Sequence, residues 1–242
     1  MPKSVFLAGA SGAVGRRLVP LLVKSGFIVA GTTRSQDKAE AVRALGAAPV
    51  VVDVFDLNAL KDAMQMVAPD AVIHQLTDLS LFDDAASRAE ALERNARIRE
   101  EGTANLVAAA LMAGCRRLIA QSISFVYAPG PKPHRESDPL NHADPLFKRS
   151  VEGVAALERE VTNTPGIDGI VLRYGWFYGP GTGADQPRTR GSLHVDAAAH
   201  AALLAIDRGW PGTYNIAEDD GEVTIDKAHA EFGFDPGYRS AN

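Results

Sequence analysis

Short apolar runs alternate with amphipathic segments along most of the chain. The apolar runs, rich in Val, Ile and Leu, cover residues 4–9, 27–34, 48–54, 70–76, 116–124 and 169–175. Such runs are typical of strands buried on both faces of a parallel sheet. The segments between them repeat apolar residues at helical spacing, over residues 12–26, 37–46, 57–67, 85–113 and 144–160. This alternation predicts an α/β fold with a Rossmann-like, doubly wound parallel sheet.

Two loops interrupt the alternation, and each follows the C-terminal end of a predicted strand. Residues 127–145 are rich in Pro, His and charge, and residues 175–192 are rich in Gly, Arg and aromatic side chains. Open parallel sheets bind ligands at this edge. We therefore expect a dinucleotide-binding core over residues 1–175 and a small C-terminal substrate-binding region over residues 176–242. A returning helix and strand in that region, at about residues 194–217, are expected to pack on the core.

The segment "GASGAVG" joins the first predicted strand to the first predicted helix. Glycines at such a turn allow a tight bend and close approach of a pyrophosphate, and the helix N-terminus offers N–H groups and a positive dipole end. The spacing is G-x-x-G-x-x-G and not the tighter G-x-G-x-x-G. The alternative is a glycine-rich turn that holds no ligand. The residues expected to contact a dinucleotide here are Gly9, Ser11, Gly12, Ala13, Val14 and Gly15.

The ends of the second and third predicted strands carry candidates for the adenosine half of that dinucleotide. Arg34 stands where an NAD site needs an acid for the ribose 2′-hydroxyl, and its guanidinium fork suits a 2′-phosphate. NADP(H) is therefore favoured over NAD(H). The alternative is that Arg34 is solvated and that Asp37 makes a weaker ribose contact. Asp53 is a candidate for the adenine amino group, with Val54 beside it, although an acid here can also cap the next helix, a role for which Asp56 is better placed.

Composition narrows the classes of function. The formal net charge is −5 and no dense basic tract exists, which argues against a nucleic-acid partner. No stretch is long enough for a membrane span, and no Cys/His spacing suggests a metal site. The single cysteine, Cys115, excludes an internal disulfide, and the first residues lack a signal-peptide pattern. These features favour a cytoplasmic protein that acts on a small molecule.

With these motifs in place, the chain resembles the short-chain dehydrogenase/reductase superfamily, in its extended or atypical branch, the NAD-dependent epimerase/dehydratase family. The resemblance is carried by "GASGAVG", "VVVDVFD", "QSISFVYAPG", "LRYGWFYGPGT" and "LHVDAAAHAAL" in this order, over nearly the whole chain. It implies a Rossmann domain, a nicotinamide dinucleotide and a substrate cleft built by the C-terminal part. It also implies a Ser, Tyr, Lys triad in which the tyrosine moves a proton to or from the substrate.

The sequence departs from that triad at each member. When "SISFVY" is aligned with the family pattern, Ile123 occupies the position of the serine. Phe147 and Val151 occupy the positions of the tyrosine and the lysine. The cofactor half of the site is thus expected to be intact while the usual acid/base half is absent. Three outcomes are open: another residue moves the proton, water or the substrate supplies it, or the protein senses dinucleotide without chemistry.

Replacement catalytic residues are sought at the end of the fifth predicted strand. Ser122, Ser124 and Tyr127 are the candidates, and Tyr127 has the alternative of a purely structural tyrosine. On the cofactor side, Leu76 is expected to line the nicotinamide. Arg173 is expected to touch the cofactor or the substrate, with a buried ion pair as the alternative.

The sequence therefore favours an NAD(P)-dependent oxidoreductase, or an epimerase/dehydratase-like enzyme, with non-standard proton transfer. The alternative is a non-catalytic NADP(H)-binding sensor or regulator. The apolar segments "NLVAAALMA" and "VEGVAAL" would also suit a homodimer interface, although core packing alone explains them.

Overall fold

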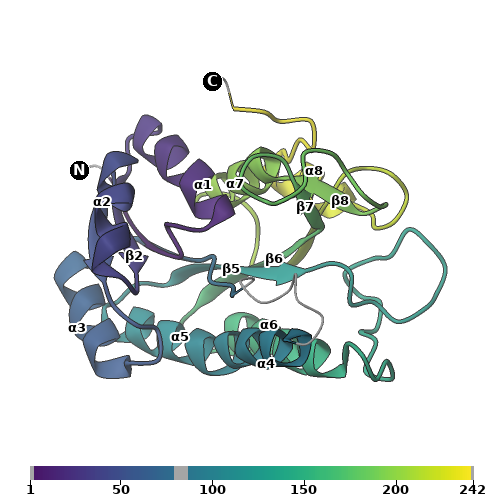
Figure 1. Ribbon diagram of the computed structural model, residues 1–242, viewed down its shortest axis with the longest axis horizontal. Helices are drawn as coiled ribbons and strands as arrows, with labels where there is room; N and C mark the ends of the chain where they lie inside the picture. Colours follow the sequence, from purple (N-terminus) through teal and green to yellow (C-terminus); the bar gives the residue numbers. More distant parts are fainter. Residues whose placement is uncertain (1–2, 79–86, 241–242) are drawn as a thin grey trace.

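A parallel sheet forms the centre of the protein, whose computed structural model describes residues 3–78 and 87–240 (Figure 1). Its strands are β1 (Ser4–Ala8), β2 (Ile28–Thr33), β3 (Ala48–Val51), β4 (Ala71–His74), β5 (Arg117–Ile123), β6 (Asp168–Tyr174) and β9 (Gly212–Ile216). They lie in the order β3-β2-β1-β4-β5-β6-β9, and every pairing is parallel. The chain therefore reverses its direction of winding between β1 and β4, the position at which such sheets bind ligands. The predicted fold class is confirmed.

Helices cover both faces of the sheet. One face carries α1 (Ala13–Lys24), α2 (Gln36–Ala44) and α7 (Val195–Leu204). The other carries α3 (Leu57–Val67), α4 (Arg88–Arg97), α5 (Thr103–Met112) and α6 (Lys148–Asn163), so the two groups stand above and below the sheet in Figure 1. A last helix, α8 (Asp226–Phe232), packs beside β9.

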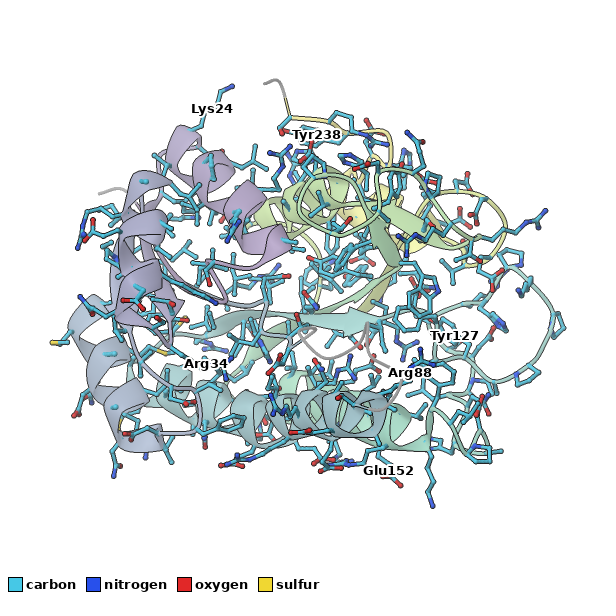
Figure 2. The ribbon with its side chains drawn as sticks, viewed as in Figure 1. Lys24, Arg34, Arg88, Tyr127, Glu152 and Tyr238 are labelled. Atoms are coloured by element: carbon cyan, nitrogen blue, oxygen red, sulfur yellow. The ribbon has the colours of Figure 1, made fainter. Side chains whose placement is uncertain are left out.

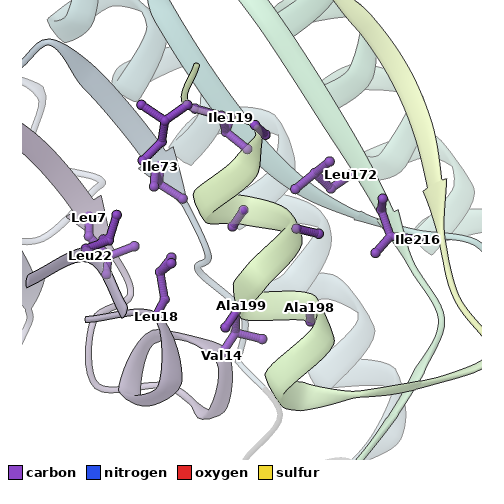
Figure 3. Packing of buried hydrophobic residues seen from close by; sticks show 14 of the residues in the cluster. Leu7, Val14, Leu18, Leu22, Ile73, Ile119, Leu172, Ala198, Ala199 and Ile216 are labelled. Carbon is purple, nitrogen blue, oxygen red and sulfur yellow. The ribbon is translucent and has the colours of Figure 1, made fainter. Parts of the chain in front are cut away.

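Each face of the sheet has its own apolar core. On the first face, Val14 and Leu18 of α1 pack beside Ala198 and Ala199 of α7, and the small alanine side chains let the two helices approach closely (Figure 3). The second face is filled by Val, Leu and Met side chains from α3, α5 and α6. These contacts hold the N-terminus of α1, and with it the glycine turn, against the sheet.

The helical stretch predicted over residues 85–113 is interrupted in the structure. Within the described part of it, α4 and α5 are joined by a π-helical turn, η1 (Ile98–Gly102). A π-turn adds one residue to the helical repeat and shifts the side chains that follow to a new face. This shift lets α4 pack on α6, where Gly153 lies so close to α4 that a Cβ would come within 2.9 Å of Ala96 Cα.

The C-terminal part returns to the sheet through α7 and β9. The strand β9 pairs with β6, with Leu172 opposite Tyr214. The second loop contains two short strands that the sequence pattern did not predict, β7 (Trp176–Tyr178) and β8 (Ser192–His194), which pair in parallel. They carry this part of the chain past the C-terminal ends of β5 and β6.

Candidate active site

The glycine turn connects β1 to α1 and needs two of its three glycines for the fold itself. Gly9 has φ +95°, and a Cβ there would lie 2.7 Å from the carbonyl oxygen of Gln75. A Cβ on Gly15 would lie 2.2 Å from the carbonyl oxygen of Gly9. Gly12 differs, because it is exposed and a Cβ there would meet only the oxygen of Gly9, at 3.4 Å. The absence of a side chain at Gly12 therefore leaves room for an outside group.

The first turn of α1 faces this open glycine. Helices leave the N–H groups of their first turn without intrahelical acceptors, and here these belong to Ala13, Val14 and Gly15. Val14 is buried in the core, so it offers an outside group only its backbone, while Ser11 is half-buried at the mouth of the turn. Donors and a dipole end thus converge where an anion can approach.

Arg34 and Asp53 lie at the neighbouring ends of β2 and β3. The side chain of Arg34 is exposed and makes no hydrogen bond or ion pair with any residue that the structure describes. The carboxylate of Asp53 accepts a hydrogen bond from the backbone N–H of Phe55 at 3.0 Å. Asp56 caps α3 by accepting from Ala59 N–H at 3.0 Å, which leaves Asp53 free of the capping role. Val54 is buried directly after it.

The end of β4 is buried and carries the polar side chains of His74 and Gln75. Leu76 is half-buried, and its N–H donates to Nδ1 of His74 at 3.2 Å. On its other side the His74 ring lies 3.2 Å from the hydroxyl of Thr103. Burial, aided by the positive charge of Arg99, lowers the pKa of His74 to about 4. His74 is therefore a neutral core histidine at physiological pH.

The three catalytic candidates lie close together at the end of β5, but their surroundings differ. The hydroxyl of Ser122 is buried and donates to Oε1 of Glu158 at 2.9 Å. The hydroxyl of Tyr127 accepts from Arg173 at 2.7 Å and donates to Asn215 at 2.6 Å. Ser124 is fixed by its backbone N–H, while its hydroxyl makes no hydrogen bond with the described residues. Of the three, Ser124 is the one whose hydroxyl has no partner among the described residues, although the residue itself is buried.

Arg173 lies in a buried ion pair, the alternative weighed for it from the sequence. Its guanidinium donates to Oε1 and Oε2 of Glu158 at 2.8 and 2.6 Å. A further donor reaches the carbonyl oxygen of Glu136 at 3.2 Å. Burial alone would lower the pKa of Arg173, but the hydrogen bonds and charge of Glu158 raise it above its ordinary value. Most of the N–H donors of Arg173 are thus hydrogen-bonded to groups of the protein itself.

The positions expected to hold the acid/base pair are apolar in three dimensions as well. Phe147 is the N-cap of α6, partly exposed, and Val151 lies one turn further on, fully buried. Val151 packs with Val126 and Val154 in a small cluster separate from the two main cores. We call these three residues the valine cluster. No titratable group belongs to it.

Three further titratable side chains near the ends of β5 and β6 are tied into the protein. Tyr174 is fully buried, and burial raises its pKa above its ordinary value. Tyr178 donates to Glu218 and accepts from Arg239. His134 lies 3.1 Å from the carboxylate of Asp138.

An aromatic pair joins the segments that follow β5 and β6. The rings of Phe125 and Trp176 stack at 3.6 Å with an interplanar angle of 13°. Trp176 is 43% exposed, so its side chain is accessible at the surface. In Figure 2, Tyr127 and Arg34 lie toward opposite sides of the molecule. Arg34 follows β2 and Tyr127 follows β5, and the strands β1 and β4 lie between these two in the sheet.

Two residues of the site escaped the sequence-based predictions. Glu158 lies in a charged helical segment that resembles a solvated face, and Arg99 lies in another. Glu158 is buried against Ser122 and Arg173, and Nη1 of Arg99 is buried without a hydrogen-bond partner. No local signal marks either one, because each is turned inward by the packing of α4 and α6.

No group of three or more His, Cys, Asp or Glu side chains between residues 3 and 78 or 87 and 240 could hold a metal ion. In the same segments, no helix has both the length and the apolar character that crossing a bilayer requires.

The sheet order, the glycine turn and the open helix N-terminus define a doubly wound, dinucleotide-binding type of protein. Residues 5–199 match the model of the NAD-dependent epimerase/dehydratase family, and the chain belongs to this family. This confirms the resemblance inferred from the sequence motifs, and the prediction of an NAD(P)-dependent oxidoreductase or epimerase.

Named relatives include both types of enzyme. The chain is 39% identical over 239 residues to a 3-diazoavenalumate denitrifying reductase of a Streptomyces species, covering 89% of this chain and 76% of the relative. It is 29% identical over 246 residues to a 4-hydroxy-2-methyl-3-oxo-4-farnesyl-3,4-dihydroquinoline-1-oxide ketoreductase of Stigmatella aurantiaca, covering 91% and 69%. The UDP-glucose 4-epimerase of Thermotoga maritima shares the fold with a TM-score of 0.74 at 19% identity, covering 96% and 83%.

Proposed function

We propose that this protein is an NADPH-dependent reductase of a small aromatic substrate, and that the glycine turn and its neighbours hold the cofactor. The assignment of the cofactor to this turn rests on Gly12, the one glycine of the turn where an added Cβ would fill open space and would not clash with the protein. A pyrophosphate at this point would meet the free N–H groups of α1. The residues that would hold the dinucleotide are Gly9, Ser11, Gly12, Ala13, Val14, Gly15, Arg34, Asp53, Val54 and Leu76.

The preference for NADP(H) within this proposal rests on Arg34. A guanidinium that is exposed and unpaired at the end of β2 is available to a 2′-phosphate. No carboxylate stands at that place for a ribose hydroxyl, because Asp53 follows the next strand and Asp37 lies within α2. Bound NADPH would supply a hydride to the substrate.

The observation that carries the choice of reaction is the valine cluster. A carbonyl that takes up a hydride becomes an alkoxide and requires a proton, which this family pattern draws from a tyrosine and lysine. Here those positions are Phe147, partly exposed, and Val151, buried among apolar side chains. The arrangement favours a substrate that needs no proton from α6.

An arenediazonium group meets that requirement. When it takes up one hydride, the carbon–nitrogen bond breaks, N₂ leaves and the hydrogen ends on carbon, so charge balances without an added proton. The relative named as a diazo denitrifying reductase supports this class of substrate. Ketone reduction, supported by the name of the second relative, is the other candidate, with water as the proton source.

Within this proposal the residues at the end of β5 have different tasks. The hydroxyl of Ser124 has no partner among the described residues and would contact the substrate, while Ser122 and Tyr127, both bonded inside the protein, hold the strand end in place. The stacked rings of Phe125 and Trp176 offer an apolar surface for an aromatic substrate. Trp176 belongs to the proposed substrate-binding region over residues 176–242.

The test compares two substrates of matched shape. Purified protein is given NADPH and 4-carboxybenzenediazonium, or NADPH and 4-acetylbenzoate, and the rate without protein is subtracted. We expect one NADPH oxidised for each N₂ released and each benzoate formed, and slow or no reduction of the ketone. Faster turnover of 4-acetylbenzoate would replace the diazo assignment by a ketoreductase. Tight NADPH binding with no turnover of either would favour a sensor.

A further inference from the structure

Arg99 is a half-buried cation whose guanidinium has no hydrogen-bond partner among the described residues. It lies in the π-helical turn η1, and its Nη1 atom is buried with no hydrogen bond. No other atom of its guanidinium has a hydrogen bond or ion pair with a residue that the structure describes. Its neighbours on α4 differ, since Arg94 pairs with Glu90 and Arg97 pairs with Glu101, both at the surface.

The position of Arg99 follows from the elements that flank its turn. The turn η1 packs on α6, and Thr103, directly after η1, lies 3.2 Å from the ring of His74 at the end of β4. Arg99 therefore lies in the region between the end of β4 and α6, the helix that carries Glu158, and its charge contributes to the lowered pKa of His74. Burial lowers the pKa of Arg99 to about 10, so it stays positively charged at physiological pH.

Glu158 is the carboxylate whose charge acts on Arg99, but it makes no hydrogen bond with Arg99. Both oxygens of Glu158 are taken by Arg173, and one of them also accepts from Ser122. A buried donor of a charged group that lacks a hydrogen bond is costly, and proteins normally pair such groups. The π-turn that turns Arg99 inward is itself a local irregularity of a kind found at functional sites.

We infer that Arg99 binds an anionic oxygen of the substrate, a phenolate or a carboxylate, beside the reacting group. This inference rests on the proposed function for the location of the substrate. It adds a chemical requirement to it: the substrate carries a negative charge at the end that enters between β4 and α6. A charge-assisted hydrogen bond would then satisfy the donor that the protein leaves open.

The test measures binding and needs no turnover. Protein saturated with NADP⁺ is titrated by calorimetry with two pairs of probes, 4-nitrophenolate against 4-nitroanisole and benzoate against methyl benzoate. We expect the anion of at least one pair to bind about 10- to 100-fold more tightly than its neutral partner, as loss of a charged hydrogen bond would cost. The pair that shows this preference identifies the anion as phenolate or carboxylate.

Variants then assign the preference to one residue. Arg99→Gln should abolish the preference without changing the affinity for NADP⁺, while Arg116→Gln, an exposed arginine at the opposite edge of the sheet, should keep it. A preference that survives Arg99→Gln overturns the inference. So does a loss of NADP⁺ affinity with the preference intact, since the guanidinium would then serve the cofactor.

Stability separates a binding role from a structural one. Arg99→Met removes an unpaired buried charge, so we expect a Tm at or above that of the wild type. A lower Tm, with equal loss of charged and neutral probes, would make Arg99 structural and overturn the inference. If anion preference persists while no diazonium compound is reduced, the proposed reaction fails and the Arg99 site stands.

Discussion

Arg173 holds both carboxylate oxygens of Glu158 in a buried, two-pronged ion pair, at 2.8 and 2.6 Å. The pair joins β6 to α6 directly behind the strand end that carries the candidate catalytic residues. Ser122 and Tyr127 are bonded to its two members. The polar groups of this region thus form a fixed support, and Ser124, two residues beyond Ser122, is buried with a hydroxyl that has no partner among the described residues.

Removing one member of the pair should destabilise the protein strongly. Glu158→Gln leaves the guanidinium of Arg173 buried without its counter-charge, and we expect a loss of about 3–5 kcal/mol in the free energy of unfolding, measured with urea. Arg149→Gln is the control, because Arg149 pairs with Glu93 and Glu100 near the surface and should cost about 0–1 kcal/mol. Equal losses in the two variants would contradict the buried role.

The glycines at positions 12 and 15 should separate fold from binding. Gly15→Ala places a Cβ 2.2 Å from the oxygen of Gly9, so it should lower both the Tm and the affinity for NADP⁺. Gly12→Ala meets only an ordinary contact at 3.4 Å and should cost less than about 1 kcal/mol of stability. It should nonetheless weaken NADP⁺ binding at least about tenfold, since the methyl group occupies the approach of the pyrophosphate. Unchanged binding in a stable Gly12→Ala protein would place the dinucleotide elsewhere.

Arg34 should control the choice between the two nicotinamide cofactors. Arg34→Ala is expected to weaken NADPH binding by about 10- to 100-fold, the value of a charge-assisted phosphate contact, and to leave NADH binding unchanged. Arg43→Ala is the matched control, an exposed arginine on α2 that pairs with Glu40. The proposed preference is wrong if both variants bind NADPH equally well.

The fold was predictable because its signals are local. Apolar runs, helical periodicity and the glycine turn each lie within a few residues, and they locate the sheet, the helices around it and the candidate phosphate contact Arg34. The pairing of Glu158 with Arg173 joins a helix to a strand, so no short segment contains it. The inward turn of Arg99 depends on a π-turn that helical periodicity does not encode. Charged segments therefore suggested solvent-exposed faces where the structure has two buried groups.

The candidate catalytic residues should respond differently to small changes. Ser124→Ala removes a hydroxyl without an internal partner, so we expect a lower kcat with an unchanged Tm. Ser122→Ala removes a buried hydrogen bond to Glu158 and should cost about 1–3 kcal/mol of stability. Tyr127→Phe leaves a donor of Arg173 and the acceptor oxygen of Asn215 without a hydrogen bond, so it should lower stability by about as much as Ser122→Ala. A loss of kcat confined to Tyr127→Phe, with unchanged stability, would make Tyr127 the proton-transfer residue.

His74 should make the protein less stable in mild acid. Its pKa is about 4 in the folded protein because burial, and then the charge of Arg99, disfavour the protonated ring, whereas its ordinary value is 6.5. Between these values the unfolded chain binds a proton that the folded protein does not. The contribution of His74 to stability is therefore complete above about pH 6.5 and falls as the pH drops toward 4.

Urea unfolding at pH 7.0 and pH 4.5 measures this contribution. We expect a decrease of about 2–3 kcal/mol from His74, to which His194 and His200 add in the same direction because their pKa values are also lowered by burial. His74→Asn keeps an acceptor for the N–H of Leu76 but removes the titrating ring, so it should be less stable at pH 7.0 and lose less between the two pH values. If the variant and the wild type lose the same free energy over this interval, His74 is protonated in the folded protein at pH 4.5, and a neutral, buried ring at the end of β4 is excluded.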